Sequence, residues 1–244
     1  MNYTPSNTIV FLLAAGRGER MRPLTDTTPK PLLKVGGRNL LEHHLIHLQM
    51  AGFKHIVINI AHLAEQIKTV IGDGSQFGLN IKYSDESNTG ALETAGGIFN
   101  ALDLIQSDPF LVINADIYTD FPFEQLLAPL NKSSLGRLVI INNPEHNPTG
   151  DFAISGSETS GKASALTLKG ENKEQQTITF SGIGLYQKQF FTHLGKGSQA
   201  LGPLLRAAIS KNQLEHTHYQ GQWFDIGTPE RLAEINNRIS QSHV

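Results

Sequence analysis

Three uninterrupted apolar runs constrain the fold of this chain more than any other feature. They cover residues 9–14, 56–60 and 110–114. Strands that are apolar on both faces are typical of parallel sheets buried between helices. The segments between the runs place apolar residues at helical spacing, most clearly over residues 40–51 and 92–104. This alternation predicts an α/β three-layer sandwich with a mostly parallel, Rossmann-like sheet.

The sequence changes character after about residue 137. Further strands are predicted over residues 138–141, 152–154, 165–168 and 177–186, with a Ser/Gly/Thr-rich hairpin tip or loop at 155–162. Helices are expected near residues 201–210 and 229–240. No repeat or long linker divides the 244 residues, so we expect one domain over residues 1–244. Its first half covers about 8–136, and a β-rich insertion in the second half, about 137–244, covers one edge of the sheet.

Composition excludes several classes of protein. The chain has no cysteine, which excludes disulfides, thiol catalysis and cysteine-ligated zinc, and which fits a reducing cytoplasm. Its net charge of −2 argues against a nucleic-acid partner. No apolar run approaches the roughly 20 residues of a membrane helix, and residues 1–8 carry no Lys or Arg as a signal peptide would. We therefore expect a cytoplasmic protein without a membrane or nucleic-acid partner.

The loop after the first apolar run carries the strongest chemical signal. Gly16 and Gly18 let the backbone approach a ligand closely at the sheet edge where α/β folds bind ligands. Four cations accompany them, namely Arg17, Arg20, Arg22 and Lys30. The loop matches neither the Walker pattern nor GxGxxG, because Met21 stands at the third glycine position. Glycines with convergent cations favour a polyphosphate cradle over the alternative, a solvated basic loop.

The same segment carries a family resemblance. Residues 12–33, LLAAGRGERMRPLTDTTPKPLL, resemble the LAAGxGxRMxPLT…PKPL signature of the sugar-phosphate nucleotidylyltransferases. Four more segments resemble motifs of that family in the same order, namely GDGSQFGL at 72–79, LETAGG at 92–97, NAD at 114–116 and WFDIGTPERL at 223–232. The family forms are GDGSxxGL, LGTAGG, NGD and WxDIGTPxxL. The resemblance therefore extends over nearly the whole chain.

The resemblance implies an enzyme that transfers a nucleotidyl group from an NTP to a sugar 1-phosphate with Mg²⁺ and releases pyrophosphate. GDF at 150–152, FSGI at 180–183 and the chain length are similar to the short uridylyltransferases that act on an amino-sugar 1-phosphate in cell-wall sugar recycling. The expected substrates are therefore UTP and a sugar 1-phosphate. We expect a monomer without the C-terminal β-helix domain that many relatives append.

The resemblance also assigns the catalytic residues. Arg20 would contact the β- and γ-phosphates, Lys30 the α-phosphate, and Asp116 and Asp225 would hold Mg²⁺. Further nucleotide-binding residues would be Ala14, Ala15, Gly16, Arg17, Gly18, Glu19, Glu86, Gly90 and Ala91. Glu86 stands where the family reads the base, and a carboxylate accepts only N–H bonds, which favours UTP or GTP over CTP or ATP.

The sugar pocket is expected in the β-rich half. Its candidate residues are Asn114, Asn142, Gly150, Asp151, Ser181 and Gly182. The family's Glu-Lys-Pro segment is replaced by GENK at 170–173, so Lys169 or Lys173 is the candidate for the sugar phosphate. Two alternatives stay open: a guanylyl- or other nucleotidylyltransferase for a hexose 1-phosphate, and a non-catalytic nucleotide-sugar sensor.

Overall fold

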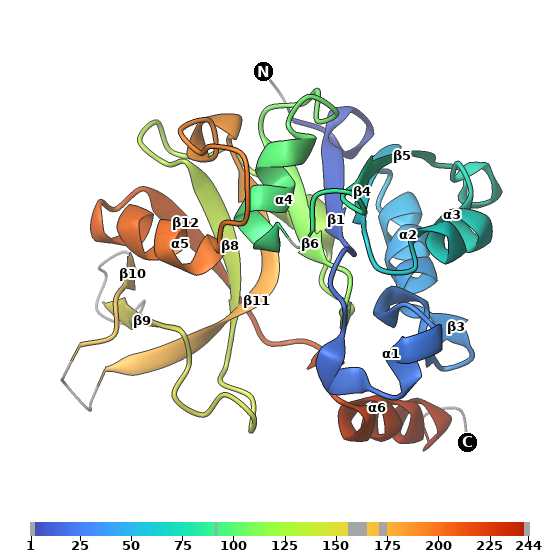
Figure 1. Cartoon of the computed structure of the whole chain (residues 1–244). Helices are drawn as coiled ribbons and strands as arrows, with labels where there is room; N and C mark the ends of the chain where they lie inside the picture. Colours follow the sequence, from blue (N-terminus) through green and yellow to red (C-terminus); the bar gives the residue numbers. More distant parts are fainter. Residues whose placement is uncertain (1–2, 91, 156–164, 171–174, 242–244) are drawn as a thin grey trace.

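The computed structural model describes residues 3–90, 92–155, 165–170 and 175–241, and within them nine strands form one mixed sheet. Its parallel part runs in the order β6-β1-β4-β5 (Figure 1). The bounds are β1 (Ile9–Leu13), β4 (His55–Ile60), β5 (Asn80–Asp85) and β6 (Phe110–Asn114). The three apolar runs are therefore neighbouring strands, as predicted.

The β-rich half continues this sheet through one long strand, β11 (Gln176–Tyr186). It pairs antiparallel with β6 on one side and with β8 (Gly136–Ile141) on the other. Strand β12 (Leu214–Tyr219) runs parallel to β8. The first half of β11 also pairs with β9 (Phe152–Ser155), which pairs with β10 (Ala165–Thr167). Most of the loop predicted at 155–162 lies outside the described residues.

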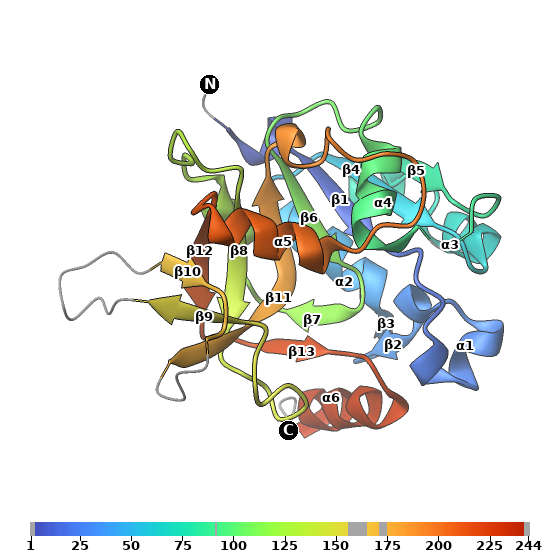
Figure 2. The same cartoon turned by 60° about the vertical axis from the view of Figure 1, so that its left-hand side comes forward.

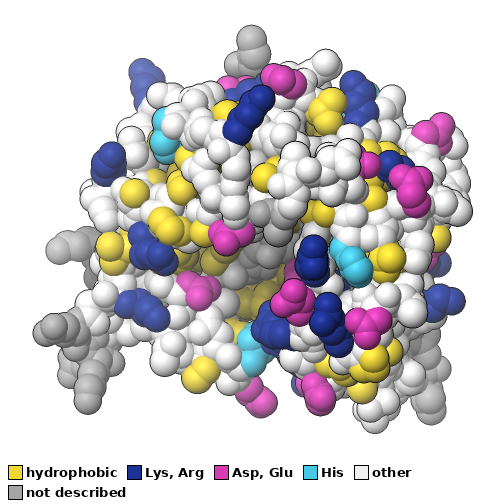
Figure 3. Space-filling model, viewed as in Figure 1, with side chains coloured by type: hydrophobic (Ala, Val, Ile, Leu, Met, Phe, Trp, Pro, Cys, Tyr) yellow, Lys and Arg dark blue, Asp and Glu magenta, His cyan; other side chains and the backbone are white. Residues whose placement is uncertain are grey.

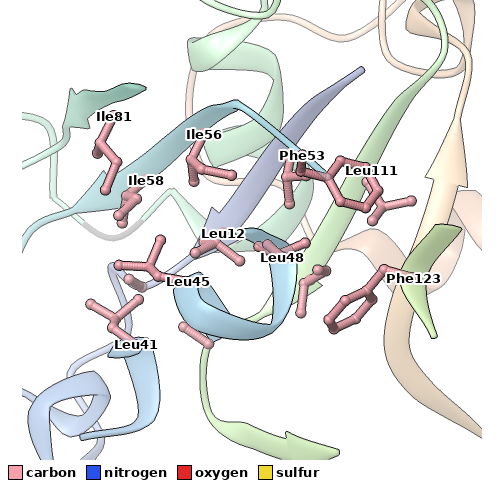
Figure 4. Close-up of a cluster of buried hydrophobic side chains, with 14 of the residues drawn as sticks. Leu12, Leu41, Leu45, Leu48, Phe53, Ile56, Ile58, Ile81, Leu111 and Phe123 are labelled. Carbon is pink, nitrogen blue, oxygen red and sulfur yellow. The ribbon is translucent and has the colours of Figure 1, made fainter. Parts of the chain in front are cut away.

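Helices cover both faces of the sheet, which confirms the predicted three layers (Figures 1 and 2). The helices are α2 (Leu40–Met50) and α3 (Ala64–Ile71) on one face and α4 (Glu93–Ala101) and α5 (Leu201–Ser210) on the other. Alternate strand residues point to opposite layers. Leu12 packs with Leu45 of α2 (Figure 4), whereas Phe11 lies in the cluster on the other face with Ile98 of α4. Both faces of the strands are apolar because both are buried.

A smaller cluster joins the C-terminal helix to the loop after β1. Helix α6 (Pro229–Gln241) places Ile235 against Met21 and Ile226. Thr228 caps this helix, because its Oγ accepts a hydrogen bond from the backbone N–H of Arg231 at 3.4 Å. The short elements nearby are α1 (Leu24–Thr27), β2 (Lys34–Val35) and β3 (Arg38–Asn39).

One more strand pair lies beside the central sheet. Strand β7 (Ile117–Thr119) pairs antiparallel with β13 (Trp223–Asp225), and Figure 2 shows the pair between the sheet and α6. This pairing brings two distant motifs of the sequence together. Among the described residues, no helix is both long and apolar enough to cross a lipid bilayer.

Candidate active site

A cavity of about 410 Å³ opens at the carboxyl ends of β1, β4 and β6. Leu13 pairs in register with both Asn59 and Asn114, so the three residues form one row at this edge. The central hollow in Figure 3 has Lys/Arg and Asp/Glu side chains around its rim. The predicted nucleotide-binding residues that line the cavity are Ala14, Ala15, Gly16, Arg17, Gly18, Arg20, Lys30 and Glu86.

Two further predicted nucleotide-binding residues, Glu19 and Gly90, do not line this cavity. Glu19 begins the one-turn helix Glu19–Met21 and is exposed. Gly90 is exposed, and Ala91 lies outside the described residues. The fourth cation of the loop, Arg22, is an exposed partner of Asp26 at 3.2 Å. Three of the four cations therefore face the cavity.

Asn59 connects the glycine-rich loop to the Glu86 carboxylate, and it was not among the residues predicted from the sequence. Its Oδ1 accepts a hydrogen bond from the Ala14 backbone N–H at 2.7 Å, and its Nδ2 donates to Glu86 Oε1 at 2.9 Å. A Cβ at Gly97 of α4 would come within 2.9 Å of Glu86 Oε1, so only glycine allows this close packing. Burial raises the pKa of Glu86, and the hydrogen bond from Asn59 opposes that shift. The sequence signal that could have identified Asn59 was its place as a polar residue near the end of an otherwise apolar strand.

Lys30 and Asp116 form an ion pair at the edge of the cavity. Lys30 opens the one-turn helix Lys30–Leu32, and its Nζ lies 2.5 Å from Asp116 Oδ2. The lysine side chain is 10% exposed and the aspartate side chain 34%. Gly18 packs against the lysine stem, since a Cβ there would lie 3.1 Å from Lys30 Cβ. The loop therefore fixes where this ammonium group sits.

Asp225 reaches the same region through the β7–β13 pair. The Ile226 N–H donates to the Asp116 carbonyl at 2.9 Å, which fixes the two aspartate-bearing segments side by side. Asp225 Oδ2 lies 2.8 Å from Arg231 Nη1 and 3.4 Å from His146 Nε2. Asp225 itself does not line the first cavity.

Asp225 has two ion-pair partners that were not predicted from the sequence. They are His146 and Arg231. The pKa of His146 is lowered by burial first, and further by the positive charges of Arg231 and Arg20. Arg20 lines the first cavity, so the His146 ring lies within electrostatic range of a residue of that cavity. His146 also stacks on Trp223, with ring centroids 6.4 Å apart.

The carboxylates of Asp116 and Asp225 have the chemistry of a magnesium site that is completed by substrate. Their side chains are 34% and 21% exposed, and they lie on paired segments. The structure brings together no group of three or more metal-ligating side chains within the residues it describes. Mg²⁺ commonly takes one or two carboxylates and completes its shell with water and substrate phosphates. This pair of donors fits that pattern.

A second cavity of about 850 Å³ adjoins the first and shares Glu93, Thr94 and Asn114 with it. Of the predicted sugar-binding residues, Asn114, Gly150 and Asp151 line it. Two cations, Lys169 and Arg206, line it as well. Lys169 Nζ donates to the Gly150 carbonyl at 2.7 Å, while Lys173 lies outside the described residues.

The other predicted sugar-binding residues lie outside the lining of both cavities. Ser181 is buried, and its Oγ donates to the Val139 carbonyl at 2.8 Å. Gly182 has a φ of +82° and packs against the Asn114 side chain. Gly182 therefore supports the position of Asn114. Asn142 Oδ1 accepts a hydrogen bond from His218 Nε2 at 3.0 Å.

Comparison with known proteins identifies the class that this fold and site define. Residues 9–242 match the nucleotidyl transferase family, so the chain belongs to that family. It is 45% identical to an N-acetylmuramate alpha-1-phosphate uridylyltransferase of Neisseria meningitidis serogroup B, over 92% of this chain and 95% of that protein. This agrees with the resemblance drawn from the motifs.

More distant relatives carry other names. A UTP–glucose-1-phosphate uridylyltransferase of Synechocystis is 27% identical over 95% of this chain, which spans 63% of that protein. A solved structure from Bacillus anthracis, in complex with sucrose, superposes with a TM-score of 0.79 at 20% identity and covers 95% of each chain. HddC from Yersinia pseudotuberculosis, complexed with GMP-PN, gives 0.72 at 18% identity and covers 95% of this chain and 99% of its own. These two structures confirm the fold.

Proposed function

We propose that the protein transfers a uridylyl group from UTP to N-acetylmuramate 1-phosphate, giving UDP-N-acetylmuramate and pyrophosphate. The observation that carries this proposal is the pair of adjoining cavities. The first holds the glycine loop, Arg17, Arg20 and the Lys30–Asp116 pair, as a nucleotide site requires. The second lies next to it, shares Asn114, and is large enough for a sugar. The two substrates would meet where the cavities join.

The reaction needs no general base. A phosphate monoester has a second pKa near about 6, so the attacking oxygen of the sugar phosphate is already ionised at neutral pH. The residues must orient two anions and stabilise negative charge. Lys30 is placed to neutralise charge on the α-phosphate, and Arg20 to stabilise the leaving pyrophosphate. Mg²⁺, held by Asp116 and Asp225, would neutralise phosphate charge at the reacting centre.

Preference for UTP is supported by Glu86. Its carboxylate lines the first cavity and is fixed by Asn59. A carboxylate accepts the ring N–H of uracil, whereas cytosine has no donor at that ring nitrogen. Guanine also offers ring and amino N–H groups, which keeps a guanylyltransferase as the second candidate. A relative named mannose-1-phosphate guanylyltransferase, from Mycobacterium tuberculosis, is 26% identical over 90% of this chain, which spans 61% of that protein.

Preference for an acidic sugar is supported by Lys169 and Arg206. N-acetylmuramate carries a lactyl carboxylate that N-acetylglucosamine lacks. Both cations line the second cavity, and the structure shows no acidic partner of either side chain among its described residues. Cations of this kind bind carboxylates strongly. We assign both cations to the lactyl group, so that Lys169 takes this role in place of the sugar-phosphate contact expected from the resemblance. The reaction would belong to cell-wall sugar recycling in the cytoplasm. One chain supplies both cavities, so a monomer suffices.

The proposal is tested by measuring pyrophosphate release with Mg²⁺, each of the four NTPs, and a panel of sugar 1-phosphates, with the sugar nucleotide confirmed by mass. We expect the highest kcat/KM for UTP with N-acetylmuramate 1-phosphate. Preference for GTP with a hexose 1-phosphate would establish the second candidate instead. No pyrophosphate with any pair, together with nucleotide-sugar binding, would identify a sensor.

A further inference from the structure

Glu93 holds an unusual position between the two cavities. It lines both of them, and it is the first residue of α4. Its side chain is exposed, and no hydrogen-bond or ion-pair partner for it occurs among the residues that the structure describes. The proposed reaction gives this carboxylate no role.

The backbone at Glu93 is also unusual. Its φ is +55°, in the left-handed region that glycine adopts freely and that side chains with a Cβ disfavour. The surrounding turn enforces this conformation, since Gln199 donates its N–H to the Leu92 carbonyl and accepts from Ala95 N–H, both at 2.9 Å. Strained residues held by their surroundings concentrate at functional sites. Glycine would fit this backbone conformation better, so the presence of glutamate indicates that its carboxylate has a function.

The chemistry of a carboxylate limits what Glu93 can bind. When ionised it only accepts hydrogen bonds, so it repels phosphate and attracts hydroxyl or amide N–H donors. Within the described residues, Glu93 belongs to no group of three or more metal-ligating side chains. At the junction of the cavities, the donors are the hydroxyls and the amide of the sugar.

We propose that Glu93 accepts a hydrogen bond from a hydroxyl or the amide N–H of the sugar 1-phosphate and so determines how the sugar is oriented. This inference rests on the proposed function, because it assigns the second cavity to the sugar. Glu93 is then a specificity-determining residue, kept at the expense of backbone strain. The ribose of the nucleotide offers similar hydroxyls, and the experiment separates the two sources.

The test compares the Glu93→Gly and Glu93→Gln variants with wild type. Loss of a hydrogen bond to a charged group should raise KM for the sugar 1-phosphate about tenfold or more, with KM for UTP unchanged. Glu93→Gly should keep or raise Tm, because glycine relieves the left-handed backbone. The matched control is Asn212→Gly, which changes a residue with φ of +53° that lines neither cavity and should leave both KM values unchanged.

Three results would overturn the inference. A rise in KM for UTP alone would assign Glu93 to the ribose. Unchanged KM values for both substrates would remove it from recognition. A fall in Tm with no change in KM would make its role structural. Absence of turnover in wild type would overturn the proposed function as well, whereas an active wild type with unaffected variants overturns this inference alone.

Discussion

At the residue scale, the Lys30–Asp116 ion pair is the contact that the proposed reaction must change. The ammonium and the carboxylate are 2.5 Å apart, and the lysine is nearly buried. In the proposed reaction both groups have other partners, since Lys30 binds phosphate and Asp116 binds Mg²⁺. Substrate and metal must therefore replace this contact.

Replacement of Lys30 separates catalysis from binding. We expect Lys30→Ala to lower kcat about a hundredfold and to raise KM for UTP only modestly, because charge at the α-phosphate builds up in the transition state. The control is Arg22→Ala, which removes an exposed cation of the same loop that pairs with Asp26. Steady-state kinetics would contradict this role if KM rose a hundredfold with kcat intact.

Replacement of Glu86 tests how the base is read. We expect Glu86→Ala to narrow the kcat/KM preference for UTP over CTP by about 1–3 kcal/mol, since a buried hydrogen-bond acceptor is lost. The residue is buried and lines the nucleotide cavity, so water replaces its contact poorly. Identical NTP preferences in wild type and variant would show that other groups select the base.

The residues that could be predicted from the sequence lie within local motifs. Arg20, Lys30 and Glu86 were predicted to act together, and they line one cavity, whereas their binding of a nucleotide stays a prediction. Asn59 and His146 were missed because their roles depend on contacts across the sheet and on the long loop after β8. Ser181 was expected at the sugar, but its hydroxyl bonds to the backbone of β8.

At the scale of elements, the β7–β13 pair positions the proposed metal site. Asp225→Asn keeps the shape of the side chain but removes its charge, so we expect kcat to fall at least about a hundredfold at saturating Mg²⁺. We expect Asp116→Asn to lower kcat by a similar factor. Asp26→Asn, an exposed residue of the glycine-rich segment, serves as the control. Turnover near the wild-type rate in either variant would remove that aspartate from the metal site.

Helix α2 makes stability sensitive to acid through His44. Burial lowers the pKa of this imidazole from 6.5 to about 4, and a hydrogen bond with the Ile117 backbone partly opposes the shift. As pH falls below 6.5 the unfolded chain takes up a proton at His44, and the native state does not until about pH 4. The native state should therefore lose up to about 3 kcal/mol across this range from His44 alone.

Urea unfolding at pH 7 and pH 4.5 measures this effect. Wild type should lose more of its free energy of unfolding between the two pH values than His44→Leu does, whatever the stability of the variant at pH 7. The same loss in both proteins would show that His44 does not carry the acid sensitivity.

Helices and strands with a strong hydrophobic pattern could be predicted from the sequence, and those with a weak hydrophobic pattern could not. Strand β6 and helix α5 have the predicted bounds. Strand β5 was missed because it lies at the edge of the sheet, mixes polar with apolar residues, and has neither an apolar run nor a regular alternation of buried and exposed residues. Strands β7 and β13 have three residues each, and only their mutual pairing defines them.

At the scale of the whole molecule, β11 joins the two halves. Its pairing with β6 places the β-rich half beside the carboxyl edge of the parallel sheet, and its first half carries β9. The two cavities adjoin because of this single strand. Sequence patterns predicted a β-rich insertion at a sheet edge, whereas its pairing with β6 required the structure.

The selectivity of the second cavity tests whether N-acetylmuramate 1-phosphate is the sugar substrate. The measurement is the ratio of kcat/KM for N-acetylmuramate 1-phosphate to that for N-acetylglucosamine 1-phosphate, both with UTP. We expect wild type to favour the acidic sugar at least about tenfold, because Lys169 and Arg206 bind its carboxylate. The ratio should fall towards one in the Lys169→Ala/Arg206→Ala double variant. Equal kcat/KM values for the two sugars in wild type would contradict the assignment of Lys169 and Arg206 to the lactyl carboxylate.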